Sequence, residues 1–254
     1  DAQESRGLGD VYKRQILYNS VIMLSERRED NNMDGLSFDE IKKQIRDAIQ
    51  MDYIEPADIP AIELYMDQVT TFMDKHLSNN KRTPDDKILT KTMINNYTKN
   101  HLLPPPEKKK YSKEHIILLI YTYYLKNFLS IGDIQKLLAP MIEKYFHASE
   151  TDSVTLESIY STVVELAQLQ YQMDKQEIFK TYEIVNQKIR DEHPELASDA
   201  MNSASYLQDF TFVALLSYDI YLKTQLVEKI IDELVPDQST DSSAEASKNA
   251  KEEK

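Results

Sequence analysis

The chain has no cysteine and no tryptophan, and only 4 of its 254 residues are glycine. Without cysteine, a disulfide framework, a thiolate nucleophile and a cysteine-ligated metal are excluded. Sheets joined by tight hairpins usually need more glycine than this, so the composition favours helices. We therefore expect an all-α protein.

A long uncharged apolar run is also missing. The best candidate, residues 212–222, is shorter than the ~20 residues that cross a bilayer, and it contains Asp219. No N-terminal stretch combines basic, apolar and small-residue regions as a secretory signal does. We expect a cytoplasmic protein that does not insert into a membrane.

Sequence motifs that support catalysis or cofactor binding are missing as well. No P-loop, dinucleotide fingerprint or nucleophile elbow occurs, and no two of the five histidines are spaced i,i+4. Residues 30–40 resemble an EF-hand loop, but Glu40 comes one position too early to be its bidentate ligand. Ser37 and Glu40 instead form a capping box. We expect no enzymatic activity, no cofactor and no metal.

Positive charge is scarce overall but concentrated in one place. The formal net charge is −13, yet residues 81–126 contain ten Lys or Arg and four Asp or Glu. This segment therefore carries +6 and the remainder −19. A basic segment in an acidic protein indicates a local surface for an anionic partner.

Helix signals cover most of the chain. Caps and apolar periodicity predict helices over about 37–50, 60–77, 84–89, 91–99, 113–129, 131–145, 153–191 and 204–234. The predicted apolar stripe of the second helix is Ile62, Tyr65, Met66, Val69, Phe72 and Met73. A seam spaced by three and four, as in a coiled coil, is predicted at Leu156, Ile159, Val163, Leu166, Leu169 and Met173.

The predicted helix 91–99 has two distinct faces. At ~100° per residue, Met93, Ile94 and Tyr97 lie on one side. Residue types that suit DNA lie on the other: lysine neutralises phosphate, threonine donates to it, and asparagine pairs with adenine. The residues of this outer face are Lys91, Thr92, Asn95, Asn96 and Lys99.

A basic projection follows this helix. Pro104–Pro106 stop any helix, and Lys108, Lys109 and Lys110 come directly after. Tyr111 is expected to anchor the base of this loop, and Lys113 extends the basic stretch. A recognition helix followed by a basic loop is how winged helix-turn-helix proteins hold a groove and its flanking phosphates. The alternative is an ordinary solvated helix and loop, since charge runs are usually solvated faces.

Residues 90–138, TKTMINNYTKNHLLPPPEKKKYSKEHIILLIYTYYLKNFLSIGDIQKLL, resemble the bacterial family catalogued as domain of unknown function 1836. Their pattern is in turn similar to the DNA-binding half of MerR-type regulators. There, a short recognition helix leads to a "GLLPP" wing, a Tyr-containing strand end, a helix and "I.D.I..LL". The corresponding residues here are Asn96-Tyr97, Leu102-Leu103-Pro104-Pro105, Tyr111 and Ile131-Gly132-Asp133-Ile134. With residues 58–77, the resemblance covers about 53–147.

The resemblance has two departures. His101 stands where those regulators usually have glycine, so we expect Asn100 to take the left-handed conformation. The first helix of the motif is either very short, at 84–89, or separated by a long loop, at 60–77. The resemblance implies transcriptional regulation by DNA binding and names no operator or effector.

The predicted organisation has five regions. A non-native or disordered extension covers 1–32, whose first fifteen residues resemble translated adapter sequence, and a helix that begins at the capping box covers 33–52. A DNA-binding-like domain covers 53–147, a helical dimerisation or effector region 148–235, and a disordered acidic tail 236–254.

The predicted fold is an all-α, MerR-like winged helix-turn-helix followed by a bundle of long helices. The predicted function is DNA-binding transcriptional regulation, with double-stranded DNA as the partner. A homodimer is expected, because a single small recognition helix usually needs a symmetric copy. The alternative is a non-enzymatic adaptor that uses the same fold to bind another protein. The predicted DNA-binding residues are Lys91, Thr92, Asn95, Asn96, Lys99, Lys108, Lys109, Lys110, Tyr111 and Lys113.

Overall fold

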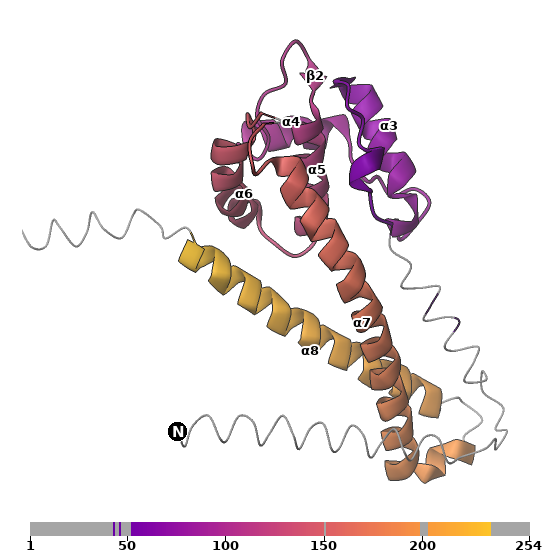
Figure 1. Cartoon of the computed structure of the whole chain (residues 1–254). Coiled ribbons are helices and arrows are strands. Elements are labelled where there is room, and N and C mark those ends of the chain that lie inside the picture. Colours follow the sequence, from indigo (N-terminus) through magenta and orange to yellow (C-terminus); the bar gives the residue numbers. More distant parts are fainter. Residues whose placement is uncertain (1–42, 44–45, 47–51, 150, 199–202, 235–254) are drawn as a thin grey trace, which may run out of the picture. The chain divides into compact units, whose positions relative to one another are not determined.

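A computed structural model describes residues 43, 46, 52–149, 151–198 and 203–234. This part of the chain is mostly helical, with two strands of two residues each, so the all-α prediction is confirmed at this level (Figure 1). The elements are η1 (Pro56–Asp58), β1 (Leu64–Tyr65), α3 (Met66–His76), η2 (Ser78–Asn80), α4 (Lys91–Lys99), β2 (Lys110–Tyr111), α5 (Lys113–Leu125), α6 (Ile131–Tyr145), α7 (Leu156–Glu192), η3 (Pro194–Ser198) and α8 (Ser203–Leu234).

The described residues fall into two compact units. One unit holds 52–149, 151–175 and 214–234, and the other holds 43, 46, 176–198 and 203–213. The capping box at Ser37, the extension 1–32 and the tail 236–254 lie outside the described residues. Only Lys43 and Arg46 of the predicted helix 37–50 are described, and both are helical and exposed. No helix in the described part of the chain is both long enough and apolar enough to span a bilayer.

The prediction of one helix over 60–77 is wrong in its first third. Leu64–Tyr65 forms β1, which pairs antiparallel with β2, and Leu64 lies opposite Tyr111. Helix α3 begins only at Met66, where the Tyr65 N–H donates to Oε1 of Gln68 at 2.8 Å. Ile62 is therefore exposed, and the apolar stripe begins at Met66.

The short helix predicted over 84–89 is also absent, since residues 81–90 contain no helix. The Asp86 carboxylate accepts hydrogen bonds from the Thr83 N–H at 2.9 Å and from its hydroxyl at 2.8 Å. These bonds close a turn, because an aspartate side chain competes with helical backbone bonding. The α-helix that precedes α4 is therefore α3, and the segment that connects them contains η2 and buries Ile88 and Leu89.

Helix α5 lies at the centre of the core. Five consecutive residues, 116–120, are at most 1% exposed, and a helix that is apolar on every side must be surrounded. Ser112 caps it as predicted, but it ends at Leu125, earlier than the predicted 129. Helix α6 has the predicted bounds, and its cap Ser130 accepts from the Asp133 N–H at 3.1 Å.

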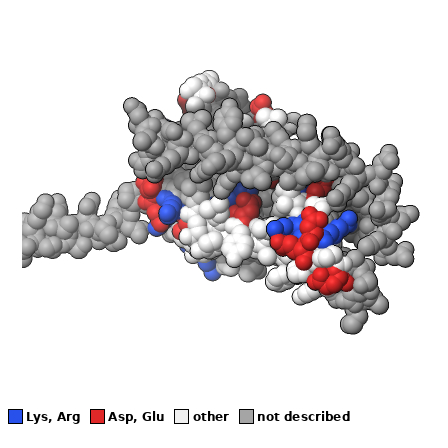
Figure 2. All heavy atoms as spheres, turned by 90° about the horizontal axis from the view of Figure 1, so that it is seen from below, with Lys and Arg blue, Asp and Glu red and all other residues white. Residues whose placement is uncertain are grey.

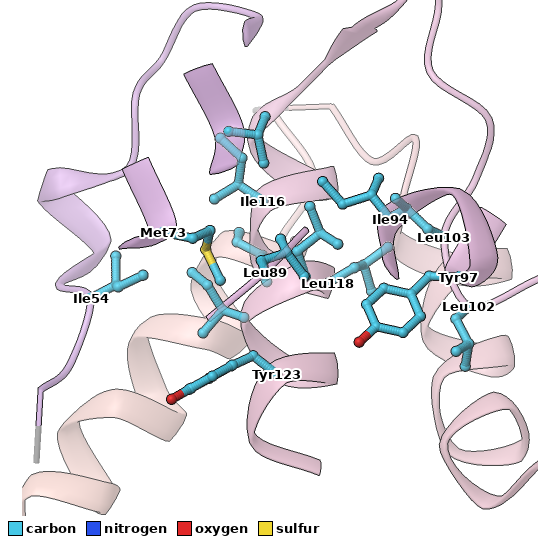
Figure 3. Packing of buried hydrophobic residues seen from close by; sticks show 14 of the residues in the cluster. Ile54, Met73, Leu89, Ile94, Tyr97, Leu102, Leu103, Ile116, Leu118 and Tyr123 are labelled. Atoms are coloured by element: carbon cyan, nitrogen blue, oxygen red, sulfur yellow. The ribbon is translucent and has the colours of Figure 1, made fainter. Parts of the chain in front are cut away.

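Figure 3 shows how the surrounding elements contribute to this core. Met73 of α3, Ile94 and Tyr97 of α4, and Leu102 and Leu103 approach Ile116 and Leu118 of α5. The buried core also includes Leu156, Tyr160 and Val164 of α7 and Ile231 of α8.

Two tyrosine hydroxyls attach the segment that precedes α3 to this core. Tyr124 donates to the carbonyl of Asp52 at 2.8 Å, and Tyr160 donates to that of Ile54 at 2.6 Å. Buried tyrosine hydroxyls usually find such partners. These bonds join residues 72 and 106 positions apart in the sequence.

The two long predicted helices are present, as α7 and α8. Leu156 of the predicted α7 seam is buried in the core. Further along the helix, the seam residues lie on the surface, with Val163, Leu166, Leu169 and Met173 exposed by 43–64%.

Candidate nucleic-acid interface

Helix α4 has the two faces that the sequence predicts. The Thr90 hydroxyl accepts from the Met93 N–H at 3.2 Å and caps the helix. Ile94 is fully buried and Tyr97 is 5% exposed, which attaches the helix to the core. The opposite face is exposed along its whole length, and its residues are Lys91, Thr92, Asn95, Asn96 and Lys99.

A Schellman motif ends α4. The Leu102 N–H donates to the Tyr97 carbonyl at 2.9 Å, and the His101 N–H donates to the Thr98 carbonyl at 3.2 Å. In this motif the residue directly before Leu102, one position after the C-cap Asn100, must have a left-handed backbone conformation. That residue is His101, with φ of 56°, and not Asn100, with φ of −92°, so the expectation for Asn100 is wrong. Asn100 instead donates its side-chain N–H to the Asn96 carbonyl.

Residues 107–111 form a basic hairpin after the proline run. Glu107 and Lys110 make an antiparallel bridge, and the Lys110 N–H donates to the Glu107 carbonyl at 2.8 Å. The two residues between them, Lys108 and Lys109, have φ of 48° and 66°. Positive φ at both central residues of a two-residue loop is the type I′ arrangement, for which Asn-Gly is preferred. The basic hairpin thus places two exposed lysines where side chains are usually small.

The basic hairpin and α4 belong to the same unit. Figure 1 shows the loop that leads into β2 rising beyond α4, with α3 beside both. Strand β1 holds the base of the hairpin, since Tyr65 lies opposite Lys110. The Lys110 ammonium also lies 5.9 Å from the centre of the Tyr65 ring.

Carboxylates neutralise three of the predicted lysines. Lys91 pairs with Asp67 of α3, Lys110 with Glu63 at 3.6 Å, and Lys113 with Glu157 of α7 at 2.6 Å. Within the part of the chain that the structure describes, no carboxylate pairs with the remaining three, which are Lys99, Lys108 and Lys109. The unpaired positive charge therefore lies at the end of α4 and the tip of the basic hairpin.

Two predicted contact residues do not lie on the open surface. Tyr111 is 2% exposed, and its ring meets the edge of His115 with centroids 5.5 Å apart. Its side chain holds the hairpin to the core and is not available to DNA. The Lys113 side chain is 21% exposed and is occupied by Glu157. The expected anchoring role of Tyr111 fits its burial, but its place among the exposed contact residues is corrected. The place of Lys113 is corrected as well, because its partner Glu157 is distant in the sequence.

His115 is a residue of this region that sequence reasoning missed. It is 4% exposed, and its Nδ1 accepts from the Ser112 N–H at 3.0 Å in a capping box. Burial lowers the pKa of its imidazole, while the carbonyls of Pro104 and Pro105 act in the opposite direction. The Phe146 ring packs against the imidazole as well, with ring centroids 4.8 Å apart and the ring planes at 89°. The spacing Ser-x-x-His before an apolar run was the available signal.

Charge elsewhere is mixed. On the face drawn in Figure 2, the described Lys and Arg side chains lie beside Asp and Glu, and no broad basic area is visible. Among the described residues, no three acidic or histidine side chains are grouped so as to hold a metal ion.

Residues 54–163 match the model of a family described as "Domain of unknown function (DUF1836)". This segment runs from before η1 into α7 and includes α4 and the basic hairpin. The predicted resemblance to that family is confirmed for this segment. No curated protein and no solved structure matches the chain.

Proposed function

We propose, on the premise that residues 54–163 form a domain of this family, that the chain is a DNA-binding transcriptional regulator with a MerR-like winged helix-turn-helix. In this proposal α4 is the recognition helix and the basic hairpin is the wing. Asn95 and Asn96 would face base edges, where asparagine can pair bidentately with adenine. Lys99, Lys108 and Lys109 would neutralise phosphates.

The observation that carries the proposal is the backbone of the hairpin tip. A left-handed conformation costs a residue with a side chain roughly 1–2 kcal/mol, and both Lys108 and Lys109 adopt it. Their exposed side chains gain no packing in return. Backbone strain of this kind clusters at active sites, ligand clamps and switch regions. Two adjacent ammonium groups held at a rigid turn suit the phosphate backbone of a duplex.

In this proposal the lysines that are already ion-paired contribute less to phosphate binding than the unpaired lysines. Lys91 and Lys110 are already neutralised by Asp67 and Glu63, so they would add little to phosphate binding. We therefore assign the main electrostatic contribution to Lys99, Lys108 and Lys109.

The test is a fluorescence anisotropy titration of the wild-type chain against labelled duplexes made from genomic fragments, at several salt concentrations. We expect the wild-type chain to bind, and the logarithm of its binding constant to fall linearly with the logarithm of the salt concentration. Absence of binding at the lowest salt concentration would reject DNA binding. Stoichiometric co-purification of another protein, without nucleic acid, would then favour the adaptor.

A further inference from the structure

The junction between the basic hairpin and α5 is built around the side chain of His115. Strand β2 ends at Tyr111, and Ser112 follows directly as the N-cap of α5. The Ser112 N–H donates to Nδ1 of His115 at 3.0 Å, and the Tyr111 ring packs against the imidazole with centroids 5.5 Å apart. The imidazole therefore contacts both residues through which the hairpin continues into the helix.

One protonation state of the imidazole fits these contacts. Because Nδ1 accepts a hydrogen bond from the Ser112 N–H, this atom must carry a lone pair, and the ring proton lies on Nε2. Nε2 of His115 is buried, and within the described part of the chain no group forms a hydrogen bond with it. The bond at Nδ1 thus selects the neutral imidazole.

A second proton, on Nδ1, would turn the bond to the Ser112 N–H into a contact between two donors. The same Nδ1 atom lies 2.9 Å from the Ser112 hydroxyl oxygen, whose own proton is donated to the Glu114 carboxylate at 2.6 Å. A protonated Nδ1 can donate to that oxygen, but the Ser112 N–H then loses its acceptor. Protonation therefore exchanges a bond that fixes the backbone after β2 for a bond to a side chain.

The groups around the ring determine which state of the hairpin takes up the proton. Burial lowers the pKa of the His115 imidazole. Two backbone carbonyls and two carboxylates act in the opposite direction, and they belong to Pro104, Pro105, Glu114 and Glu107. On the side of α6 the ring meets the apolar Phe146, which is in contact with His147. When the hairpin leaves α5, water reaches the imidazole and its pKa rises, so protons favour the released hairpin.

We propose that His115 is a proton switch that releases the basic hairpin from α5 in mild acid. Below about pH 6.5, the ordinary pKa of an imidazole, each pH unit lowers the ratio of docked to released hairpin by up to about tenfold. This decrease ends at the lower pKa of the docked state. The consequence for DNA rests on the proposed function, in which the basic hairpin is the wing. Its release would weaken DNA binding as the pH falls.

Hydrogen exchange of the Lys110 amide measures the release, since its N–H donates to the Glu107 carbonyl within the hairpin. NMR of the full ¹⁵N-labelled chain without DNA gives its protection factor, which is corrected for the pH dependence of intrinsic exchange. We expect the protection factor to fall by several-fold to tenfold between about pH 6.5 and 5.5. The ¹⁵N shifts of His115 should show an unprotonated Nδ1 above that range.

His115→Gln and His147→Gln provide a matched pair of variants. A glutamine side chain can accept from the Ser112 N–H but takes up no proton in this pH range, so the Lys110 protection factor of His115→Gln should stay constant. His147 is exposed and contacts the same Phe146 ring. His147→Gln should therefore retain the pH dependence of wild type. Circular dichroism verifies that each variant is helical.

Three results would overturn the proposal. The first is a Lys110 protection factor in wild type that does not change with pH. The second is a dependence in His115→Gln as steep as in wild type. The third is a Lys110 amide that exchanges no faster than the amide of the buried Leu118, since the hairpin would then open only when the whole fold opens. The first and third results need no variant.

These measurements contain no DNA, so they separate this inference from the proposed function. A hairpin that opens in mild acid, on a chain that binds no duplex at any pH, would reject the proposed function alone. A chain that binds duplexes, with a Lys110 protection factor independent of pH, would reject the proton switch alone.

Discussion

The backbone N–H of Leu102 donates to the Tyr97 carbonyl at 2.9 Å, and this bond determines where the chain goes after α4. Both side chains are buried, so the end of the helix is attached to the core at the same point. The His101 backbone between them turns the chain toward the basic hairpin. The proposed recognition helix and wing thus share one rigid joint.

This joint predicts that His101→Gly stabilises the fold. Glycine adopts the φ of 56° without steric cost. After subtraction of the greater chain entropy of glycine in the unfolded state, we expect a gain of about 0.5–1 kcal/mol in the free energy of unfolding. Urea denaturation measures it. Asn100→Gly is the control and should destabilise, since Asn100 is not left-handed. A loss of stability in His101→Gly would contradict the strain argument.

The hairpin tip predicts opposite effects on stability and on binding. Replacing Lys108 and Lys109 together by Asn-Gly supplies the preferred type I′ pair. We expect the free energy of unfolding of the double variant to rise by about 1–2 kcal/mol, and its unfolding temperature to rise with it. We expect the same variant to bind DNA at least tenfold more weakly. Calorimetry and anisotropy measure the two quantities. Binding equal to wild type would show that the lysines do not act on DNA.

Asn95 and Lys109 should affect different properties of DNA binding. Lys109→Glu should weaken binding to all duplexes and reduce the salt dependence by the equivalent of about one phosphate contact. Asn95→Ala should reduce the free energy of binding to the preferred DNA sequence by about 1–3 kcal/mol and change the binding of other sequences little.

A matched control for the charge change is Lys188→Glu, because Lys188 lies on α7 outside the matched family segment. Its affinity should equal that of wild type. If Lys109→Glu and Lys188→Glu lowered the affinity for DNA equally, the change in net charge would explain the loss of affinity, and the position of Lys109 in the basic hairpin would not.

His115 predicts a loss of stability in mild acid. Burial lowers the pKa of His115 below its ordinary value of 6.5. The unfolded chain therefore binds the proton first as the pH falls through about 6.5, and stability decreases from there down to the folded pKa. The slope is at most about 1.4 kcal/mol per pH unit.

The variant for this test is His115→Gln, since glutamine at this position still completes the capping box with Ser112. Its free energy of unfolding should depend less steeply on pH between 7 and about 5. Parallel curves for wild type and variant would assign the acid sensitivity to other groups.

Local interactions explain which elements were predictable. Thr90 and Ser130 cap α4 and α6 through hydrogen bonds to residues three positions further along the chain. The starts of both helices are therefore specified by residues that are close in the sequence. The two faces of α4 follow from the same local periodicity. The exposed set Thr92, Asn95, Asn96 and Lys99 could therefore be predicted without coordinates.

The sequence by itself determined where α4, α5 and α6 begin, and it determined the basic loop, because each depends on neighbours within a few residues. Only the tertiary structure decided that Leu64–Tyr65 is a strand, since its partner Tyr111 is far along the chain. The same holds for the pairing of Lys113 with Glu157. Packing and ion pairing between distant segments depend on which surfaces meet in space, and no local pattern specifies that.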